Sequence, residues 1–248
     1  MHHQCDVDTS LGWRAQAASL DGVGAYSWMA SRLYGATRVL EVGCGWGNGT
    51  LAMVVEGMKV IAVENDPNAV DATLSMLRSH GVRAEVAMSL GDGLDRSADV
   101  VIVNADIFHL LQGDVSFSAM DAIVCWNAGT EVIAFGRRTD FAGEAEAASR
   151  RVEPLQRAAF GVAARMASGT TVHVVDRVSY RHEHRPQVID AFSRRHAGLA
   201  APAVNVVPGL TTAWPYRTTE RVNEDEQRLQ GSEPLAVTAL VSTVGFVY

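Results

Sequence analysis

A glycine-rich junction between an apolar run and a helical stretch constrains the fold of this chain more than any other feature. The β-branched run 38–42 stops at four alternating glycines, Gly43, Gly45, Gly47 and Gly49. Glycines at the end of a strand permit positive φ angles and let backbone amides approach a ligand. A second apolar run, 59–63, closes on Glu64, where a carboxylate can reach the ribose hydroxyls of a nucleoside lying across the strand ends. The sequence therefore predicts a nucleoside site at the carboxyl edge of a parallel sheet.

The rest of the chain continues this alternation of strands and helices. Further strands are predicted at 100–103, 122–126 and 170–175, with one or two more at 235–248. The periodicity predicts two short helices in 11–35 and others at 50–56, 68–79, 187–196 and over much of 144–168, with Asp66 as a cap and Pro67 in the first turn. This alternation indicates a doubly wound α/β domain with its site at the carboxyl ends of the strands.

We expect a single domain in four parts. Residues 1–35 supply N-terminal helices, 36–179 the core, 180–232 an insertion or cap near the end of the sheet, and 233–248 the terminal strands.

Composition excludes several classes of protein. Acidic residues outnumber basic ones by 28 to 21, and a net charge of −7 disfavours general binding to nucleic acid. No apolar run approaches the roughly 20 residues that span a bilayer, and the first ten residues lack a secretion signal. Cys5, Cys44 and Cys125 are too dispersed to suggest a disulfide framework, so we expect a cytoplasmic protein without membrane or nucleic-acid partners.

The spacing of the glycines selects among nucleoside cofactors. A dinucleotide fingerprint needs its third glycine three places after the second, where this chain has Asn48 or Thr50. The actual pattern, Glu-x-Gly-x-Gly-x-Gly from Glu41, resembles motif I of the class I S-adenosylmethionine-dependent methyltransferases. The segment 63–66, Val-Glu-Asn-Asp, resembles the acidic second motif of that family. The resemblance covers residues 36–70 and extends as a strand pattern to about 135.

This resemblance implies a Rossmann-like, mostly parallel seven-stranded sheet with an antiparallel C-terminal strand, and S-adenosylmethionine as the cofactor. It implies that Glu41 lies under the loop or approaches the cofactor's amino group. Glu64, with Asn65 beside it, would bind the ribose. The methionine end would lie against the loop residues Gly43, Cys44, Gly45 and Gly47.

A third acidic motif of the family reads the adenine amino group, and two positions compete for it. Asp106 follows the strand-like run 100–103 and has an apolar neighbour, Ile107, to lie against the ring. Asp92, in a Gly-Asp-Gly segment, lies at a usual distance after Glu64 but lacks a preceding strand. We favour Asp106, which requires an insertion around 82–98, and retain Asp92 as the alternative.

The acceptor in this family sits beyond the tip of the fourth strand, which here reads Cys-Trp-Asn-Ala-Gly from Cys125. Trp126 would wall the transfer channel, and Asn127 is either an acceptor ligand or a turn residue. The Asn/Asp-Pro-Pro-aromatic segment of base and glutamine methyltransferases is absent. Trp214-Pro215-Tyr216 either lines an acceptor pocket or forms an exposed aromatic turn. Candidate general bases are lone polar residues: His109, Glu131, His182 and His184.

Residues 181–185, Arg-His-Glu-His-Arg, have too few imidazoles to indicate a metal site. We therefore expect methyl transfer from S-adenosylmethionine to a small-molecule acceptor. The alternatives are a protein or RNA acceptor, transfer of another carbon chain of the cofactor, and a non-catalytic nucleoside-binding scaffold.

Overall fold

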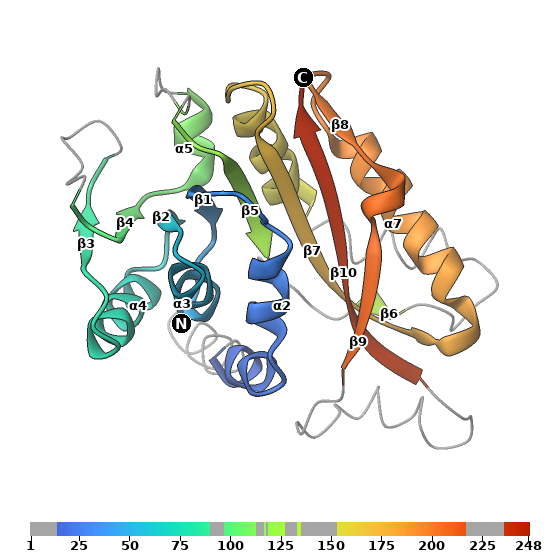
Figure 1. Ribbon diagram of the computed structural model, residues 1–248, viewed down its shortest axis with the longest axis horizontal. Helices are drawn as coiled ribbons and strands as arrows, with labels where there is room; N and C mark the ends of the chain where they lie inside the picture. Colours follow the sequence, from blue (N-terminus) through green and yellow to red (C-terminus); the bar gives the residue numbers. More distant parts are fainter. Residues whose placement is uncertain are drawn as a thin grey trace, which may run out of the picture.

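The computed structural model describes residues 14–89, 97–112, 117, 119–126, 133–134, 153–216 and 236–248. These residues form one twisted sheet with helices packed on both faces (Figure 1). The predicted doubly wound α/β class is confirmed. Within the described residues the sheet has ten strands, in the order β3-β4-β2-β1-β5-β7-β10-β8, while β6 pairs with β7 and β9 with β10.

The first half of the sheet is parallel. β1 (Arg38–Val42) lies between β2 (Lys59–Glu64) and β5 (Ala122–Trp126). On the outer side of β2 follow β4 (Val100–Asn104) and β3 (Ala84–Ala87). The chain leaves β1 toward β2 and later returns to its other side with β5, so the strand order reverses at β1. Such a switch point opens a crevice at the carboxyl ends of the strands.

The second half of the sheet is mostly antiparallel. β7 (Thr171–Arg181) continues the parallel half beside β5, and β10 (Ala236–Val247) runs antiparallel to it over eleven paired residues. The remaining strands are short: β6 (Ile133–Ala134), β8 (Val204–Val206) and β9 (Thr212–Tyr216). The sheet is thus wider than the seven strands expected, because β3, β6, β8 and β9 were not predicted.

Helices cover the two faces of the sheet in separate groups. α2 (Ala25–Ser31), α3 (Asn48–Val55) and α4 (Pro67–Ser79) pack on the face that carries Val39, Val60 and Val124. The helix at 153–163 and α5 (Ile107–Gln112) pack on the opposite face. None of the described helices is both long enough and apolar enough to cross a membrane.

Several predicted helix ends are confirmed. Asp66 caps α4 by accepting a hydrogen bond from the Asn68 backbone N–H at 2.9 Å, and Pro67 occupies the first turn.

The break between the two N-terminal helices was predicted at Asp21-Gly22, but it lies at Val23-Gly24, where Gly24 has φ 74°. A positive φ is costly for residues other than glycine, so the chain breaks where glycine supplies it.

The segment predicted as a cap is, in its described part, built into the sheet. After β7 come the 3₁₀ turn η1 (His182–His184), α7 (Arg185–Leu199), β8, η2 (Pro208–Leu210) and β9. β8 and β9 both pair with β10. Residues 180–216 therefore extend the sheet edge instead of standing over the strand ends, and 217–232 lie outside the described residues.

A buried charged network ties α7 and the helix at 153–163 to β7. Asp176 is fully buried, accepts a hydrogen bond from Gln156 Nε2 at 2.9 Å and lies 2.8 Å from His196 Nε2. Arg195 lies 3.4 Å from the same carboxylate and donates to Gln156 Oε1 at 2.9 Å. These partners hold the pKa of Asp176 below its ordinary value in spite of burial, so the carboxylate stays ionised.

Candidate functional site

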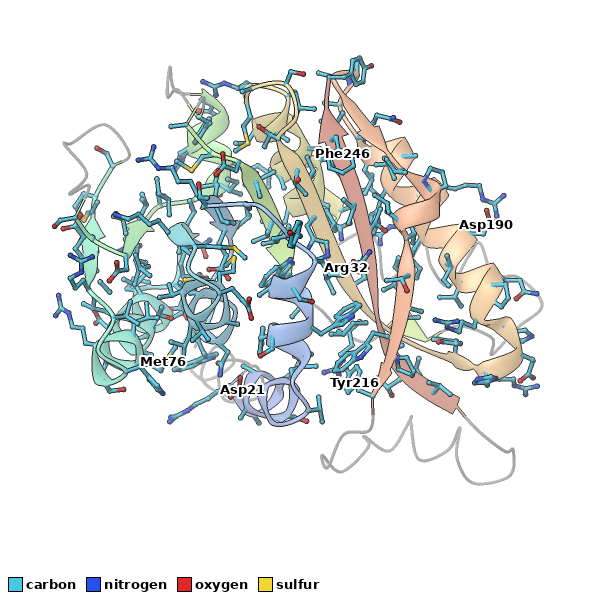
Figure 2. All side chains as sticks on the ribbon, viewed as in Figure 1. Asp21, Arg32, Met76, Asp190, Tyr216 and Phe246 are labelled. Atoms are coloured by element: carbon cyan, nitrogen blue, oxygen red, sulfur yellow. The ribbon has the colours of Figure 1, made fainter. Side chains whose placement is uncertain are left out.

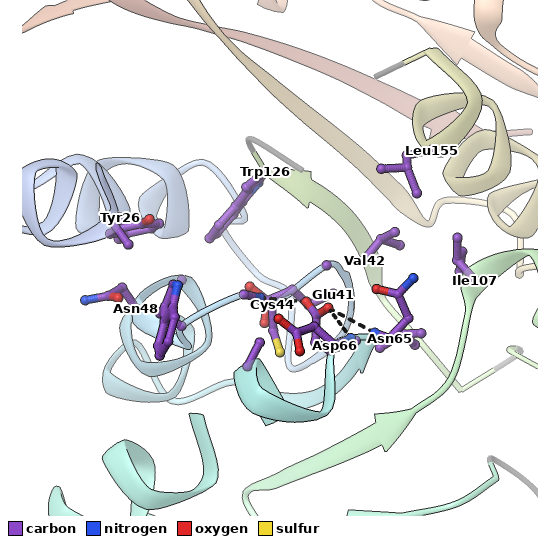
Figure 3. A pocket seen from close by; sticks show the side chains of 18 of the residues that line it. Tyr26, Glu41, Val42, Cys44, Asn48, Asn65, Asp66, Ile107, Trp126 and Leu155 are labelled. Carbon is purple, nitrogen blue, oxygen red and sulfur yellow. Dashed lines mark hydrogen bonds between the residues drawn. The ribbon is translucent and has the colours of Figure 1, made fainter. Parts of the chain in front are cut away.

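A cleft opens where β1, β2 and β4 end, at the predicted edge of the sheet (Figure 3). Its walls come from the glycine loop, the ends of these strands, the N-terminal helices and the tip of β5. In Figure 3, Asn65 and Ile107 lie toward one end of the cleft, while Tyr26 and Trp126 lie toward the other. Glu41 and Cys44 lie between these two ends.

The glycine loop forms the floor of the cleft. Gly43, Gly45 and Gly47 have φ angles of 74°, 52° and 81°, so three alternating positions use the left-handed region. A Cβ on Gly47 would lie 2.7 Å from Thr73 Cγ2, because α4 packs tightly against the loop there. A Cβ on Gly45 would meet nothing within 4 Å. The loop is therefore braced from behind at Gly47 and leaves open space at Gly45, as a cradle for a ligand requires.

Glu64, at the end of β2, is tied to the same loop. Its Oε2 accepts a hydrogen bond from the Gly45 backbone N–H at 2.9 Å. Its Oε1 accepts from the backbone N–H groups of Asn65 and Asp66, at 2.9 and 3.0 Å. These bonds fix the carboxylate in the cleft, and each carboxylate oxygen can accept more than one hydrogen bond.

Glu41 lies beneath the loop, as the sequence predicted. Its carboxylate is buried and accepts a 2.5 Å hydrogen bond from Thr50 Oγ1 in α3. Burial raises the pKa of Glu41 to about 7, the nearby Glu64 carboxylate adds to that rise, and the Thr50 hydroxyl opposes it. A buried acid that can titrate near neutral pH is well suited to interact with a cationic ligand.

Asp106 and Ile107 also line the cleft, directly after β4. The backbone N–H of Ala105 donates to the Glu64 carbonyl at 3.0 Å, which holds this turn beside the end of β2. Asp106 Oδ1 accepts a hydrogen bond from the Phe108 N–H at 2.9 Å. The strand expected before Asp106 is therefore present and carries that acid to the site. Asp92 lies outside the described residues.

Trp126 ends β5 and forms the wall next to Tyr26. Its indole N–H donates to His173 Nδ1 at 3.0 Å, and His173 Nε2 lies 2.7 Å from Ser242 Oγ. Burial, together with the Arg32 guanidinium, lowers the pKa of His173 to about 3, so the imidazole is neutral. Because the indole can only donate, the proton of His173 sits on Nε2 and points to Ser242. This chain of hydrogen bonds sets the orientation of the Trp126 ring.

The electrostatic character of the cleft is uniform. Four carboxylates line it, from Glu41, Glu64, Asp66 and Asp106, and its described lining residues include no lysine, arginine or histidine. Phosphate groups would be repelled by such a wall, whereas a cationic nucleoside would be attracted. The lining therefore favours a ligand that carries positive charge.

Other sequence candidates do not reach this cleft. His109 is exposed on α5 and is not among the lining residues, and His182 and His184 lie on η1. Asn127 and Glu131 lie outside the described residues. In the described part of the chain, no group of three or more His, Cys, Asp or Glu side chains is arranged to hold a metal ion.

Sequence reasoning missed several lining residues. They are Gln16, Ala17, Leu20, Tyr26 and Leu155, which come from the N-terminal helices and the helix at 153–163. Each lies on a helix far from the glycine loop in sequence, and none belongs to a motif. Trp214, expected either in a pocket wall or in an exposed turn, lies in β9 and stacks on Trp28 of α2 at 5.1 Å between ring centroids.

Comparison with known proteins reveals similarity at the level of structure. Neither a protein-family model nor a curated protein sequence matches the chain. Among solved structures, geranyl diphosphate methyltransferase in complex with SAM aligns with a TM-score of 0.51 at 12% identity, covering 90% of this chain and 84% of that one. A structure reported for the conversion of a disulfide bond into a thioacetal group during echinomycin biosynthesis has a TM-score of 0.51 at 17% identity, covering 91% and 82%.

These alignments extend over almost the whole chain, beyond the segment that carries the sequence motifs. The chain has the α/β, Rossmann-like fold of the class I S-adenosylmethionine-dependent methyltransferases, a mostly parallel sheet with an antiparallel C-terminal strand.

Proposed function

We propose that this protein is an S-adenosylmethionine-dependent methyltransferase that acts on a small molecule. The observation that carries the proposal is the cleft itself, in which four carboxylates and no described basic side chain surround a glycine cradle with open space at Gly45. This charge pattern suits a nucleoside that carries a cation and no phosphate, and it disfavours nicotinamide dinucleotides.

The residues present fit the cofactor along the length of the cleft. Asp106 and Ile107 would hold the adenine, and Glu64 with Asn65 would hold the ribose. The methionine end would lie against the loop 43–47 with Glu41 beneath it. When bound, S-adenosylmethionine supplies a methyl group made electrophilic by its positively charged sulfur.

The chain's own contribution is binding, orientation and exclusion of water. Trp126 is almost fully buried and its ring is fixed through His173, so it forms a rigid wall at the acceptor end of the cleft. An in-line displacement depends mainly on such alignment and desolvation. The described lining holds no histidine or lysine, so if the acceptor must lose a proton, one of the cleft carboxylates such as Glu41 would have to accept it.

The preference for a small acceptor rests on charge. A net charge of −7 works against long polyanionic acceptors such as RNA. A bulky acceptor would also have less room to enter, because the Trp28–Trp214 stack holds β9 against α2, the helix that carries Tyr26 of the cleft wall.

Methyl transfer can be tested with isotopically labelled cofactor. Purified protein is incubated with methyl-labelled S-adenosylmethionine and a fractionated pool of cellular small molecules, and the products are identified by mass. We expect a labelled product heavier than its precursor by one CH₂ unit, formed together with S-adenosylhomocysteine. Labelled protein or RNA would overturn the small-molecule assignment, and a larger mass increment would indicate transfer of another carbon chain.

A further inference from the structure

The sheet continues beyond the Trp126 end of the cleft. Trp126 pairs in register with Val175 of β7, but β7 runs on for six more residues. Side chains alternate along a strand, so Arg177 projects on the same face as Val175, about 7 Å beyond the tip of β5. This is the face that α2 covers.

Pairing across the sheet sets the neighbours of Arg177. Arg177 pairs with Leu240 of β10, which pairs with Trp214 of β9. In the next row Ser179 pairs with Thr238 and Thr238 with Tyr216. Because paired residues share a face, Arg177, Trp214 and Tyr216 project on the same side of the sheet.

Stacked aromatic rings hold α2 against this surface. Trp214 lies between Trp28 and Tyr216, with ring centroids 5.1 Å and 6.0 Å apart and interplanar angles of 12° and 22°. Figure 2 shows Tyr216 at the lower end of the sheet, next to the N-terminal helices. Tyr26 lies on the same helix, two residues before Trp28, and its side chain lines the cleft.

Arg177 has the features of a side chain placed for a ligand. Its Nε is buried and has no hydrogen-bond partner among the described residues, which is costly for a guanidinium unless a ligand completes it. Burial raises the pKa of Tyr26, the charges of Glu41 and Asp21 and the nearby Tyr216 add to the rise, and the Arg177 guanidinium opposes it. Tyr26 thus links the acidic cleft to the arginine.

We propose that Arg177, Tyr26 and Tyr216 form an acceptor subsite that recognises a carboxylate on the methyl acceptor. The guanidinium would pair with the carboxylate, the two phenols would donate to it, and Trp126 would separate it from the cofactor's sulfur. The charge of the surroundings selects a single negative charge, because the carboxylates of Glu41 and Asp21 are near enough to act on the Tyr26 phenol and would repel a phosphate dianion. This inference rests on the proposed function and specifies its acceptor.

Small carboxylates serve as probes in a binding experiment. The full chain is saturated with S-adenosylhomocysteine, whose binding is first measured by calorimetry. Acetate, benzoate and phenylacetate are then titrated, each against its neutral amide and against phenyl phosphate, by ligand-observed NMR. We expect at least one carboxylate to bind about tenfold more tightly than its amide, and more tightly than phenyl phosphate.

Variants locate the binding. Arg177→Gln should weaken carboxylate binding by roughly tenfold or more and leave the affinity for S-adenosylhomocysteine unchanged. Tyr216→Phe should weaken it severalfold. Arg181→Gln, four residues further along β7, is the matched control and should bind the carboxylate like the wild type. Thermal melting of each variant checks folding.

The outcomes are distinct. Absence of S-adenosylhomocysteine binding would refute the proposed cofactor. If S-adenosylhomocysteine binds, carboxylates that bind no better than their amides, or equally well to Arg177→Gln, would overturn the subsite alone. Tighter binding of phenyl phosphate than of benzoate would overturn the assignment of a singly charged acceptor.

Discussion

The two halves of the sheet stabilise their polar groups in different ways. Around β1 and β2, the acids Glu41 and Glu64 are held by local partners in the loop and in α3 and face a cleft. Around β7 and β10, the buried Asp176 is surrounded by side chains from α7 and the helix at 153–163, and its charge is satisfied within the protein. The first half keeps its acids available to a ligand, whereas the second half uses its acid for packing.

The largest expected effect tests the second half. Asp176→Ala removes the carboxylate that Arg195 and His196 face and leaves their polar atoms buried without it. We expect a loss of about 3–5 kcal/mol in the free energy of unfolding, measured with urea. Asp190→Ala, which breaks an exposed pair with Arg194, should cost less than about 1 kcal/mol. Equal losses would contradict the distinction between a structural acid and a surface acid.

A substitution in the glycine loop tests the first half. Gly47→Ala forces a positive φ on alanine and places its Cβ 2.7 Å from Thr73 Cγ2. We expect a loss of about 2–4 kcal/mol, together with weaker binding of S-adenosylhomocysteine. Gly57→Ala has a similar φ of 86° but open space around the Cβ, so it should cost only about 1 kcal/mol. An equal cost at both positions would show that contact with α4 does not matter.

Loss of Glu64, the acid proposed to bind the ribose, should weaken binding of the cofactor product. Glu64→Ala removes the carboxylate that orders Gly45 and Asn65 and would meet the ribose. We expect the dissociation constant for S-adenosylhomocysteine to rise by about 10- to 100-fold in calorimetry. Glu56→Ala, an exposed acid at the end of α3, is the control and should bind normally. Unchanged affinity in Glu64→Ala would remove the ribose assignment.

The last test is a pH dependence from Glu41, whose expected effect is small for each unit of pH. Its pKa is about 7 in the folded protein and about 4.5 in the unfolded chain, so the folded state holds the proton more tightly. Stability should therefore fall as pH rises from 4.5 to 7, by at most about 1.4 kcal/mol per pH unit, and level off above 7. Urea unfolding of the wild type and Glu41→Gln between pH 5 and 8 measures this slope. A wild-type curve parallel to that of Glu41→Gln would contradict the raised pKa.

The same contrast explains which parts of the structure the sequence could predict. β1, β2 and the glycine loop form a continuous motif, and their bounds and the positions of Glu41 and Glu64 follow from local spacing. β4 was also predicted, because residues 100–103 are an uninterrupted apolar run shortly before Asp106, and the strand ends one residue later at Asn104.

The second half depends on contacts between distant segments. The predicted strand stopped at Val175, because Asp176 and Arg177 look like the start of a loop, yet β7 continues to Arg181. The helix at 153–163 and α7 supply the side chains that surround Asp176, and Arg177 projects on the opposite face of the sheet. Pro215 argues against a strand, but among the described strands β9 pairs with β10 alone, so it is an edge strand and tolerates a proline. Tyr26 and Arg177 approach each other only in the folded chain.

The most direct test of the cofactor assignment is calorimetric titration of the purified protein with S-adenosylmethionine, S-adenosylhomocysteine, AMP and NADH. The acid-lined cleft predicts micromolar binding of the two sulfur nucleosides and no binding of the two phosphate-bearing ligands. Binding of NADH or AMP, or no binding of the sulfur nucleosides, would contradict the assignment of this cleft to S-adenosylmethionine.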